Sequence, residues 1–289
     1  MNHKAYGSQS MVAPLQMVLM RPPDGSFGQA DAQKWHYTAQ PDLAVAQQEH
    51  AALVQIVRQA GAEVVYHDIP LPDHADALFV HDPALVTDKG AIILQMGKVL
   101  RQGEEAAQAA MFTRLGIPIH YTLHDSARAE GGDLLWVDEQ TLAVGLGFRT
   151  NDEGLRQLQE ALPEVDVIPV HLPYFTGPEA CLHLMSFISL VADDLAVVYL
   201  PLMPVPFFQF LQGRGMRFVE VPSAEFMTMG PNVLALAPRR CVMLENNPIT
   251  QRRLEEAGCQ VWTYKGDEIS LKAEGGATCL TRPLLRSYA

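Results

Sequence analysis

Hydrophobic and polar positions recur along this 289-residue chain in five similar stretches. In each stretch, apolar residues with helical spacing are followed, most often after a glycine, by a short apolar strand. An amphipathic helix, a glycine that ends it and a strand that returns to a sheet explain this order. Helices are predicted at residues 43–59, 104–115, 153–162, 207–212 and 250–257, and the strands that follow them at 63–67, 117–121, 165–170, 216–221 and 260–264.

Pairs of apolar strands with short turns rich in Asp, Gly, Pro or Arg lie between these stretches and are typical of hairpins. The chain therefore predicts an α/β fold of about five strand–strand–helix–strand units, and the hairpins disfavour a purely parallel, doubly wound sheet. Because no unit can bury its apolar face alone, we expect the units to pack around a common core. The hairpins are predicted at 77–87 with 91–95, 133–137 with 141–144, 187–192 with 195–199 and 232–237 with 241–244, and a first strand at 11–20.

Residues 22–42 are mostly polar and lie between the first predicted strand and the first predicted helix. A loop of this length inside a compact domain is usually functional, often as a lid. Trp35, His36 and Tyr37 form an aromatic group within it. A lid and a loop that only packs over the core remain two equal alternatives.

Composition and charge narrow the function classes. At 48% hydrophobic, the chain can bury a large core, and we expect a single domain over residues 1–289. The formal net charge of −12 argues against nucleic-acid and anionic membrane partners, which require a basic face. No apolar stretch has the length of a signal-peptide core or a membrane span. Cys181, Cys241, Cys259 and Cys279 form no Cys-x-x-Cys pair, so we expect a reduced, cytoplasmic protein without disulfides or a zinc site.

Four polar clusters and two arginines interrupt the apolar pattern near the boundaries of the units. If the units form a ring, equivalent strand ends converge near its axis, and we expect the clusters to meet there. The clusters are residues 76–83 with Asp76, His81 and Asp82; 130–133 with Glu130 and Asp133; 181–187 with His183 at the head of a strand; and 274–283 with Cys279; the arginines are Arg101 and Arg149.

A cysteine, a histidine and a carboxylate can together supply a nucleophile, a proton shuttle and the group that orients the shuttle. Cys279 follows two glycines, which allow unusual backbone conformations and a close approach of a ligand. Asp82 could bind a cationic group, and Arg101 and Arg149 could bind a carboxylate. The implied ligand carries a cation at one end and a carboxylate at the other. A buried cysteine beside a turn and a core histidine are the structural alternatives.

These clusters resemble a known superfamily. The order Phe-Val-x-Asp-Pro, Arg-x-Gly-Glu, Glu-Gly-Gly-Asp, Gly-x-Arg-Thr-Asn, His-Leu-x-Ser and Gly-Gly-x-x-Cys is similar to that of the guanidine-modifying, or pentein, enzymes. Within them it resembles the dimethylarginine dimethylaminohydrolases over nearly the whole chain. The resemblance implies a five-bladed αβ-propeller, in agreement with the repeats, and it implies no cofactor and no metal.

The resemblance implies three catalytic residues. Cys279 corresponds to the nucleophile that attacks the guanidinium carbon. His183 corresponds to the proton donor for the leaving amine and then to the base for water. Glu130 corresponds to the carboxylate that orients this histidine and contacts the guanidinium. Attack would give a thiouronium-type intermediate, which water converts to a ureido product.

The resemblance also implies the substrate-binding residues. Asp82, supported by Asp76, would hold one edge of the guanidinium. Arg101 and Arg149 would hold the carboxylate of the substrate. His81 stands where the dimethylarginine hydrolases have an acidic residue, and the alternatives of a site residue and a neutral spacer stay open for it.

A second departure concerns the substrate. Arginine deiminases and glycine amidinotransferases have an aspartate two residues after the histidine, where this chain has Met185. An apolar neighbour there favours a methylated or otherwise alkylated guanidinium nitrogen over a bare one. The dimethylarginine hydrolases usually have lysine at this place, so the identity of the substrate stays open.

The resemblance therefore implies a cysteine hydrolase of a guanidino compound, with N-methylated arginine as substrate and citrulline plus methylamine or dimethylamine as products. An arginine deiminase or an amidinotransferase with the same site is the enzymatic alternative. A non-catalytic binding protein with the same fold is the alternative from another class, and in it Cys279 and His183 would be dispensable. Whether the chain is a monomer or a homodimer stays open.

Overall fold

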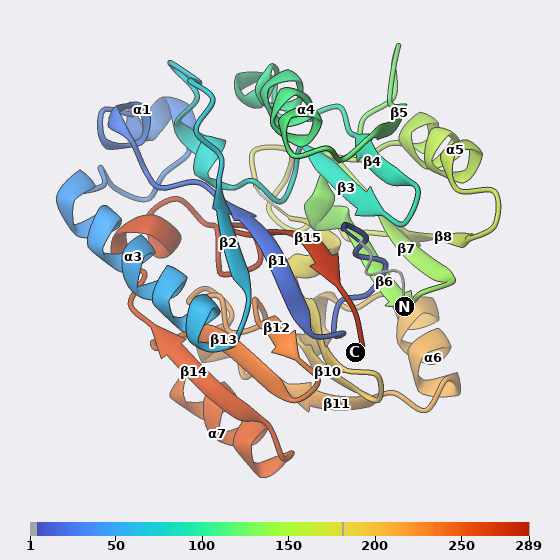
Figure 1. The fold of residues 1–289 in the computed structure, drawn as a ribbon. Helices are drawn as coiled ribbons and strands as arrows, with labels where there is room; N and C mark the ends of the chain where they lie inside the picture. Colours follow the sequence, from blue (N-terminus) through green and yellow to red (C-terminus); the bar gives the residue numbers. More distant parts are fainter. Residues whose placement is uncertain (1–4, 181, 289) are drawn as a thin grey trace.

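The computed structural model describes residues 5–180 and 182–288, which form a mixed α/β structure (Figure 1). Within this part of the chain, the strands form five three-stranded sheets. In each sheet the middle strand pairs antiparallel with one neighbour and parallel with the other. In spatial order the sheets are β15 (Arg282–Arg286), β1 (Leu15–Met20) and β2 (Glu63–Tyr66); β3 (Ala84–Thr87), β4 (Gly90–Ile93) and β5 (Ile119–Thr122); β6 (Leu134–Asp138), β7 (Thr141–Leu146) and β8 (Asp166–His171); β9 (Ile188–Ala192), β10 (Leu195–Val198) and β11 (Arg217–Glu220); β12 (Leu234–Ala237), β13 (Arg240–Leu244) and β14 (Gln260–Tyr264).

In each sheet a helix lies between the two parallel strands along the chain, and in the first sheet the two short helices α1 (Gly25–Gly28) and α2 (Ala32–Trp35) precede it. Parallel neighbours require such a crossover, because a tight turn can join only antiparallel strands. The five predicted strand–strand–helix–strand units are therefore confirmed, with bounds that shift by a few residues. The connecting helices are α3 (Leu43–Gln59), α4 (Glu104–Arg114), α5 (Asp152–Ala161), α6 (Val205–Gly213) and α7 (Pro248–Glu256).

The first sheet is built from both ends of the chain. β15 pairs with β1, and the two strands lie side by side in the middle of the fold, close to the labelled termini (Figure 1). Gly7 adds a parallel bridge to Leu285. The sequence predicted the first strand without a hairpin partner, and this partner proves to be the strand that follows Cys279.

Two predicted strand boundaries are wrong, and both errors fall next to polar clusters. Of the strand predicted at 77–87, only β3 exists, because residues 75–78 form a short 3-10 helix in which Asp76 is buried. His183 does not head a strand either, since it precedes a 3-10 helix and β9 begins at Ile188. The short helices are η1 (Ala75–Leu78), η2 (Val99–Arg101), η3 (Gly131–Asp133), η4 (Leu184–Ser186), η5 (Leu200–Leu202) and η6 (Ser223–Glu225), with a π-helix at η7 (Asp267–Leu271).

The polar segment 22–42 is more ordered than a loop. It contains α1 (Gly25–Gly28) and α2 (Ala32–Trp35), whose first turns are capped by the side chains of Asp24 and Asp31. Phe27 and Trp35 are buried in the same apolar cluster as the helix α3. The segment therefore packs on the core through these two aromatic side chains.

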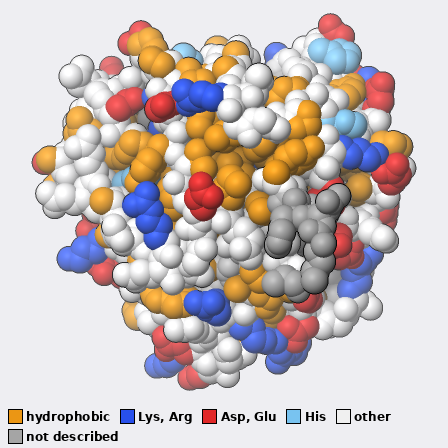
Figure 2. Space-filling view, viewed as in Figure 1, with side chains coloured by type: hydrophobic (Ala, Val, Ile, Leu, Met, Phe, Trp, Pro, Cys, Tyr) orange, Lys and Arg blue, Asp and Glu red, His pale blue; other side chains and the backbone are white. Residues whose placement is uncertain are grey.

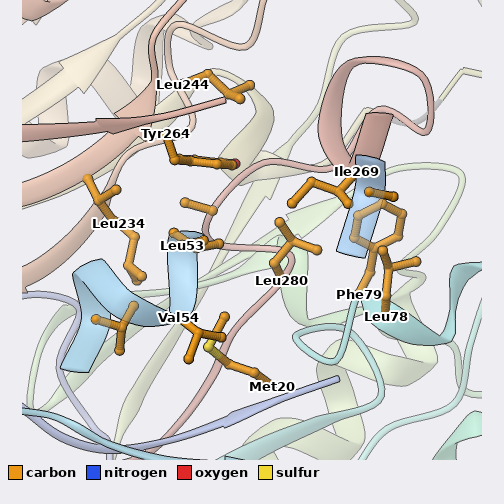
Figure 3. Close-up of a cluster of buried hydrophobic side chains, with 14 of the residues drawn as sticks. Met20, Leu53, Val54, Leu78, Phe79, Leu234, Leu244, Tyr264, Ile269 and Leu280 are labelled. Carbon is orange, nitrogen blue, oxygen red and sulfur yellow. The ribbon is translucent and has the colours of Figure 1, made fainter. Parts of the chain in front are cut away.

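The residue after Cys279 is anchored in the core. Leu280 has no exposed surface and lies among apolar side chains from the first and last sheets (Figure 3). Phe79, which precedes the cluster His81-Asp82, packs in the same place. The labelled neighbours include Met20 of β1, Leu53 and Val54 of α3, Leu234 of β12, Leu244 of β13, Tyr264 of β14 and Ile269 of η7.

Acidic and basic side chains are interspersed on the face shown in Figure 2, and hydrophobic side chains gather in its upper half. No continuous basic area crosses this face, in keeping with the net charge of −12. Among the helices of the described residues, none combines the length and the apolarity needed to cross a bilayer.

Leu284 tests the contribution of β15. Its side chain is completely buried and packs with residues of the second sheet and α4. We expect Leu284→Ala to lower the free energy of unfolding by about 2–5 kcal/mol, because it deletes buried methyl groups and leaves a cavity. Urea unfolding measures this loss. Val205→Ala is the control, since Val205 is 65% exposed and should change the value by less than about 0.5 kcal/mol. Equal losses in the two variants would contradict the role of β15.

Candidate active site

A cavity of about 680 Å³ lies where the units meet. Each of the five loops that lead from one sheet to the next contributes to its wall, and so do three loops that lead from a middle strand to its helix. The expected convergence of the unit boundaries is confirmed. The sheet-to-sheet loops contribute Asp82, Gly132, His183, Asn232 and Cys279 among others, and the strand-to-helix loops contribute Trp35, Lys98, Arg101 and Arg149.

The structure brings the candidate residues together. Glu130 is the one candidate that does not line the cavity; it has no exposed surface and lies behind His183. Cys181 lies outside the described residues. Cys241 and Cys259 are buried in a separate apolar cluster. The candidates that line the cavity are Asp76, His81, Asp82, Arg101, Arg149, His183 and Cys279.

Glu130 holds His183 in place. Its Oε2 atom is 2.7 Å from Nε2 of His183 and 3.0 Å from Nη1 of Arg149, and its Oε1 atom accepts the amide N–H of Lys98 at 2.9 Å. Burial alone would raise the pKa of Glu130, but the hydrogen bond from His183 and the charge of Arg149 lower it to about 2. Glu130 is therefore ionised, and it fixes the orientation of the imidazole.

Gly132 gives the imidazole its space. A Cβ atom on this residue would lie 2.4 Å from Nδ1 of His183, which is closer than atoms can approach. Gly131 has the same constraint, since its Cβ would lie 2.2 Å from the carbonyl oxygen of His81. The Glu-Gly-Gly-Asp motif therefore needs its glycines for close packing beneath the histidine.

Asn232 faces the sulfur of Cys279. Its side-chain amide donates to Sγ at 3.5 Å, and its carbonyl oxygen accepts the N–H of Thr278 at 3.0 Å. Cys279 is half-buried at the wall of the cavity. An amide donor in this position can stabilise negative charge on the sulfur. Sequence reasoning missed Asn232, because nothing distinguishes it from any polar residue ahead of a strand.

The two glycines before Cys279 serve packing, which corrects part of the expectation for them. Neither has a positive φ angle; the left-handed residue of the bend is Glu274, with φ 58°. A Cβ on Gly275 would lie 2.1 Å from the ring of Phe79, and one on Gly276 would lie 2.5 Å from Cγ of Asn232. The glycines therefore let the nucleophile loop lie directly on its neighbours.

His81 links the two segments of the site. Its Nδ1 atom is 2.8 Å from the carbonyl oxygen of Thr281, and its amide N–H donates to the carbonyl oxygen of Cys279 at 3.2 Å. Arg282 donates to the carbonyl oxygen of His81. Burial, and then the charge of Arg282, lower the pKa of His81 to about 3. A neutral His81 thus lines the cavity and also holds the loop of Cys279.

Asp82 and Arg101 are paired with each other. Oδ2 of Asp82 accepts from Nη1 of Arg101 at 2.6 Å, and Oδ1 accepts the amide N–H of Gly132 at 2.9 Å. Burial would raise the pKa of Asp82, but Arg101 and His183 lower it below its usual range. Arg101 also donates through Nε and Nη2 to Glu104 and through Nη2 to the carbonyl oxygen of Phe79. The structure thus places Arg101 among protein acceptors, where it neutralises the acids beside it.

Asp76 also has partners within the protein. Its Oδ2 atom accepts from Nζ of Lys98 at 2.6 Å, and its Oδ1 atom accepts the hydroxyl of Tyr37 at 2.7 Å. Lys98 donates in addition to the carbonyl oxygen of Trp35 at 3.0 Å, and its ammonium lies over the indole at 5.2 Å. Sequence reasoning missed Lys98, which carries no motif.

Asp133 connects the loops that carry His183 and Arg149. It has no exposed surface; Oδ1 accepts the amide N–H of Leu184 and Oδ2 accepts the hydroxyl of Thr150 at 2.6 Å. The same hydroxyl oxygen accepts the amide N–H of Glu130 at 3.2 Å. Asn151 instead caps α5, through the N–H of Gly154.

Apolar side chains complete the wall of the cavity. Met185 is almost fully buried and lies on the same loop as His183. Phe175, Phe226 and Met227 lie along the same cavity, and the rings of Phe175 and Phe226 meet edge to face at 5.9 Å. The described residues contain no group of three or more His, Cys, Asp or Glu side chains placed to hold one metal ion.

The family model described as N,N dimethylarginine dimethylhydrolase, eukaryotic, matches residues 26–286. The match spans most of the chain and all of the candidate residues. The chain belongs to this family. Its members are hydrolases of amidine C–N bonds within the guanidine-modifying superfamily, and so is this protein.

The chain is also similar to two further proteins in sequence and to one solved structure in fold. The uncharacterized protein YkgA of Bacillus subtilis (strain 168) is 31% identical over 242 residues, which are 83% of this chain and 80% of YkgA. The N(G),N(G)-dimethylarginine dimethylaminohydrolase of Streptomyces coelicolor is 29% identical over 247 residues, 86% of this chain and 89% of that protein. A citrulline complex of the dimethylarginine dimethylaminohydrolase from Pseudomonas aeruginosa has a TM-score of 0.76 at 22% identity, over 95% of this chain and 100% of that one, which shows a shared fold.

Gly132→Ala tests the packing beneath His183. The added Cβ cannot coexist with the imidazole, so we expect the ring to leave Glu130 and the free energy of unfolding to fall by about 1–3 kcal/mol. The ¹⁵N shifts of the imidazole of His183 and urea unfolding measure the two effects. Gly213→Ala is the control, because a Cβ there meets nothing within 4 Å. An unchanged imidazole spectrum in Gly132→Ala would contradict the packing argument.

Asp133 makes stability depend on pH. Burial raises its pKa to about 6, above the value of about 4 expected in the unfolded chain. The folded protein therefore binds this proton more tightly, and the ionised carboxylate costs stability as the pH rises from 4 to 7. Relative to Asp133→Asn, we expect the wild-type free energy of unfolding to fall by about 2 kcal/mol over this range.

Urea unfolding at each pH measures this difference. Asp138→Asn changes a half-exposed aspartate on the same hairpin, and its curve should run parallel to the wild-type curve. A parallel curve for Asp133→Asn would show that this carboxyl titrates normally.

Proposed function

We propose that this protein hydrolyses N-substituted guanidino compounds through a covalent intermediate on Cys279, with N-methylated arginine as the reference substrate. The observation that carries the proposal is the shared cavity: Cys279, His183 and Asp82 line it together, and an ionised Glu130 holds the histidine. The family membership and the citrulline bound to the related structure support a small guanidino ligand.

Charge explains how such a site would work. A guanidinium is a poor electrophile because its positive charge is delocalised. The carboxylate of Asp82 would draw this charge toward one edge of the group and hold the carbon near the sulfur. The cationic substrate in turn would favour the thiolate of Cys279.

The proposed reaction has two stages. The sulfur forms a bond to the guanidinium carbon and gives a tetrahedral adduct. The C–N bond to the substituted nitrogen then breaks, and the amine leaves with a proton from His183. Water attacks the remaining thiouronium carbon while His183 takes a proton, and the C–S bond breaks to release a ureido product and the thiolate.

Met185 supports the choice of an N-substituted substrate. Its buried thioether beside His183 offers an apolar contact and no charge. Such a neighbour suits a methylated nitrogen better than an unsubstituted one, which would lose hydrogen bonds there. Plain deimination of arginine and amidino transfer remain the alternatives, and release of ammonia or a requirement for an acceptor amine would identify them. A binding protein without catalysis would not need the bond between His183 and Glu130.

The proposal includes the setting of the enzyme. The five sheets and their connecting loops support an αβ-propeller of five blades that forms one domain over residues 1–289. The thiols of Cys241 and Cys259, which form no disulfide, support a reducing, cytoplasmic compartment.

The test is turnover of asymmetric dimethylarginine. We expect citrulline and dimethylamine in equal amounts, and under single turnover a mass increase on the peptide that contains Cys279. Cys279→Ser should lower kcat by at least about 10³-fold, because the thiolate is the nucleophile. Cys259→Ser is the control and should retain activity. Turnover that survives in Cys279→Ser, or ammonia without dimethylamine, would refute the proposal.

A further inference from the structure

Lys98 places an ammonium inside the cavity. Its side chain is only 15% exposed and is fixed by Asp76, by the carbonyl oxygen of Trp35 and by the indole of Trp35. Its own backbone is fixed as well, since its amide N–H donates to Glu130. Lys98 is therefore a built part of the wall, in direct contact with Asp76, which sequence reasoning assigned as a support for Asp82.

We propose that Asp76 faces the end of the substrate away from the guanidinium, and that Lys98 determines specificity there. By neutralising Asp76 it selects guanidino compounds that carry a carboxylate and no amino group there, the ω-guanidino carboxylates. This inference rests on the proposed function. It replaces the reference substrate, N-methylated arginine, by an analogue that lacks the α-ammonium group.

Both carboxylate oxygens of Asp76 are occupied, one by the ammonium of Lys98 at 2.6 Å and the other by the hydroxyl of Tyr37 at 2.7 Å. The α-ammonium of an amino acid needs an anionic partner when it leaves water. To use Asp76, it would have to displace Lys98 and leave that charge without its partner inside the cavity.

The other carboxylates near the cavity are engaged too. Asp82 is paired with Arg101 and is taken up by the guanidinium in the proposed reaction, and Glu130 is paired with His183 and Arg149. Glu179 lies 3.1 Å from Nε2 of His36 and is largely exposed. Each of these acids already has a partner within the protein.

Glu274 is the remaining acid of the cavity wall, and its neighbours are cationic. Burial raises the pKa of its carboxyl, while the charges of Lys98, His36 and Arg149 lower it. An ammonium bound at Glu274 would meet the same cations, with Lys98 first among them. Glu274 is therefore a poor substitute for Asp76.

A carboxylate fits the same place well. The ammonium of Lys98 has three N–H donors, and Asp76 and Trp35 accept two of them. The third can donate to a ligand carboxylate, and Arg149 adds a positive charge to the same cavity. The reaction would then break the C–N bond to the substituted nitrogen and yield an ω-ureido carboxylate and the free amine.

The experiment compares two substrates that differ only in the amino group: asymmetric dimethylarginine and its des-amino analogue, 5-(N′,N′-dimethylguanidino)pentanoate. We expect the wild-type protein to favour the des-amino compound at least tenfold in kcat/KM. In Lys98→Met the carboxylate of Asp76 becomes available to an α-ammonium, so the preference should reverse toward the amino acid. Lys98→Arg keeps the cation and should keep the wild-type preference.

Lys89→Met is the matched control, because Lys89 pairs with Glu164 at the surface and does not line the cavity. Its preference should equal that of the wild-type protein. A wild-type preference for dimethylarginine that Lys98→Met leaves unchanged would overturn the inference, although the proposed hydrolysis would stand.

A binding measurement separates this inference from catalysis. In Cys279→Ser, calorimetry with 5-guanidinopentanoate and with arginine should give a lower Kd for the compound without the amino group, and Lys98→Met in the same background should invert the order. If the protein shows this binding order but turns over neither substrate, the proposed hydrolase is refuted and the assignment of Lys98 stands. Equal Kd values, or binding of neither compound, would refute the role of Lys98.

Discussion

The fully buried carboxylate of Glu130 is the interaction on which the site depends. A charge without contact to water must be neutralised by its neighbours, and Glu130 has such neighbours on three sides. His183 comes from the loop before β9, Arg149 from the loop after β7 and the amide of Lys98 from the loop after β4. Because these loops belong to different sheets, one buried anion fixes their positions relative to each other.

The same requirement governs the rest of the cavity. Asp82 is matched by Arg101, and Arg101 is matched again by Glu104. Loss of one member of such a group costs more than the group contributes, since a buried charge then remains without a partner. The side chains around the cavity are therefore held before any ligand enters, and an electrostatically preorganised site needs no rearrangement when charge develops in the reaction.

The sequence predicted what is local and missed what depends on distant partners. Helical spacing and turn residues sufficed for the five units, because both signals lie within about twenty residues. The pairing of β15 with β1 joins the two ends of the chain, and no local pattern reports it. The strand predicted at 77–87 was too long because Asp76 and His81 turn into the site instead of following the alternation of a strand.

The prediction of the site residues from the sequence had the same limit. Motif resemblance found the candidate residues, and the structure places most of them in the wall of one cavity and Glu130 directly behind His183. It could not find Asn232 or Lys98, whose importance lies in the atoms they face: the sulfur of Cys279 and the carboxylate of Asp76. The freedom of glycine suggested an unusual backbone conformation before Cys279, whereas the structure requires Gly275 and Gly276 for contact with Phe79 and Asn232.

This difference bears on how the substrate is chosen. The residues assigned by resemblance were expected to hold the guanidinium and the carboxylate of the substrate, so they carry little information about the rest of the molecule. Recognition of the rest of the molecule depends on which polar atoms of these residues are already occupied by other side chains of the protein. In this protein Lys98 occupies the carboxylate of Asp76. A cation of the chain itself therefore stands where a ligand could have placed a cation. Under the assignment proposed for Lys98, specificity follows from the charge balance within the cavity, which only the folded arrangement defines.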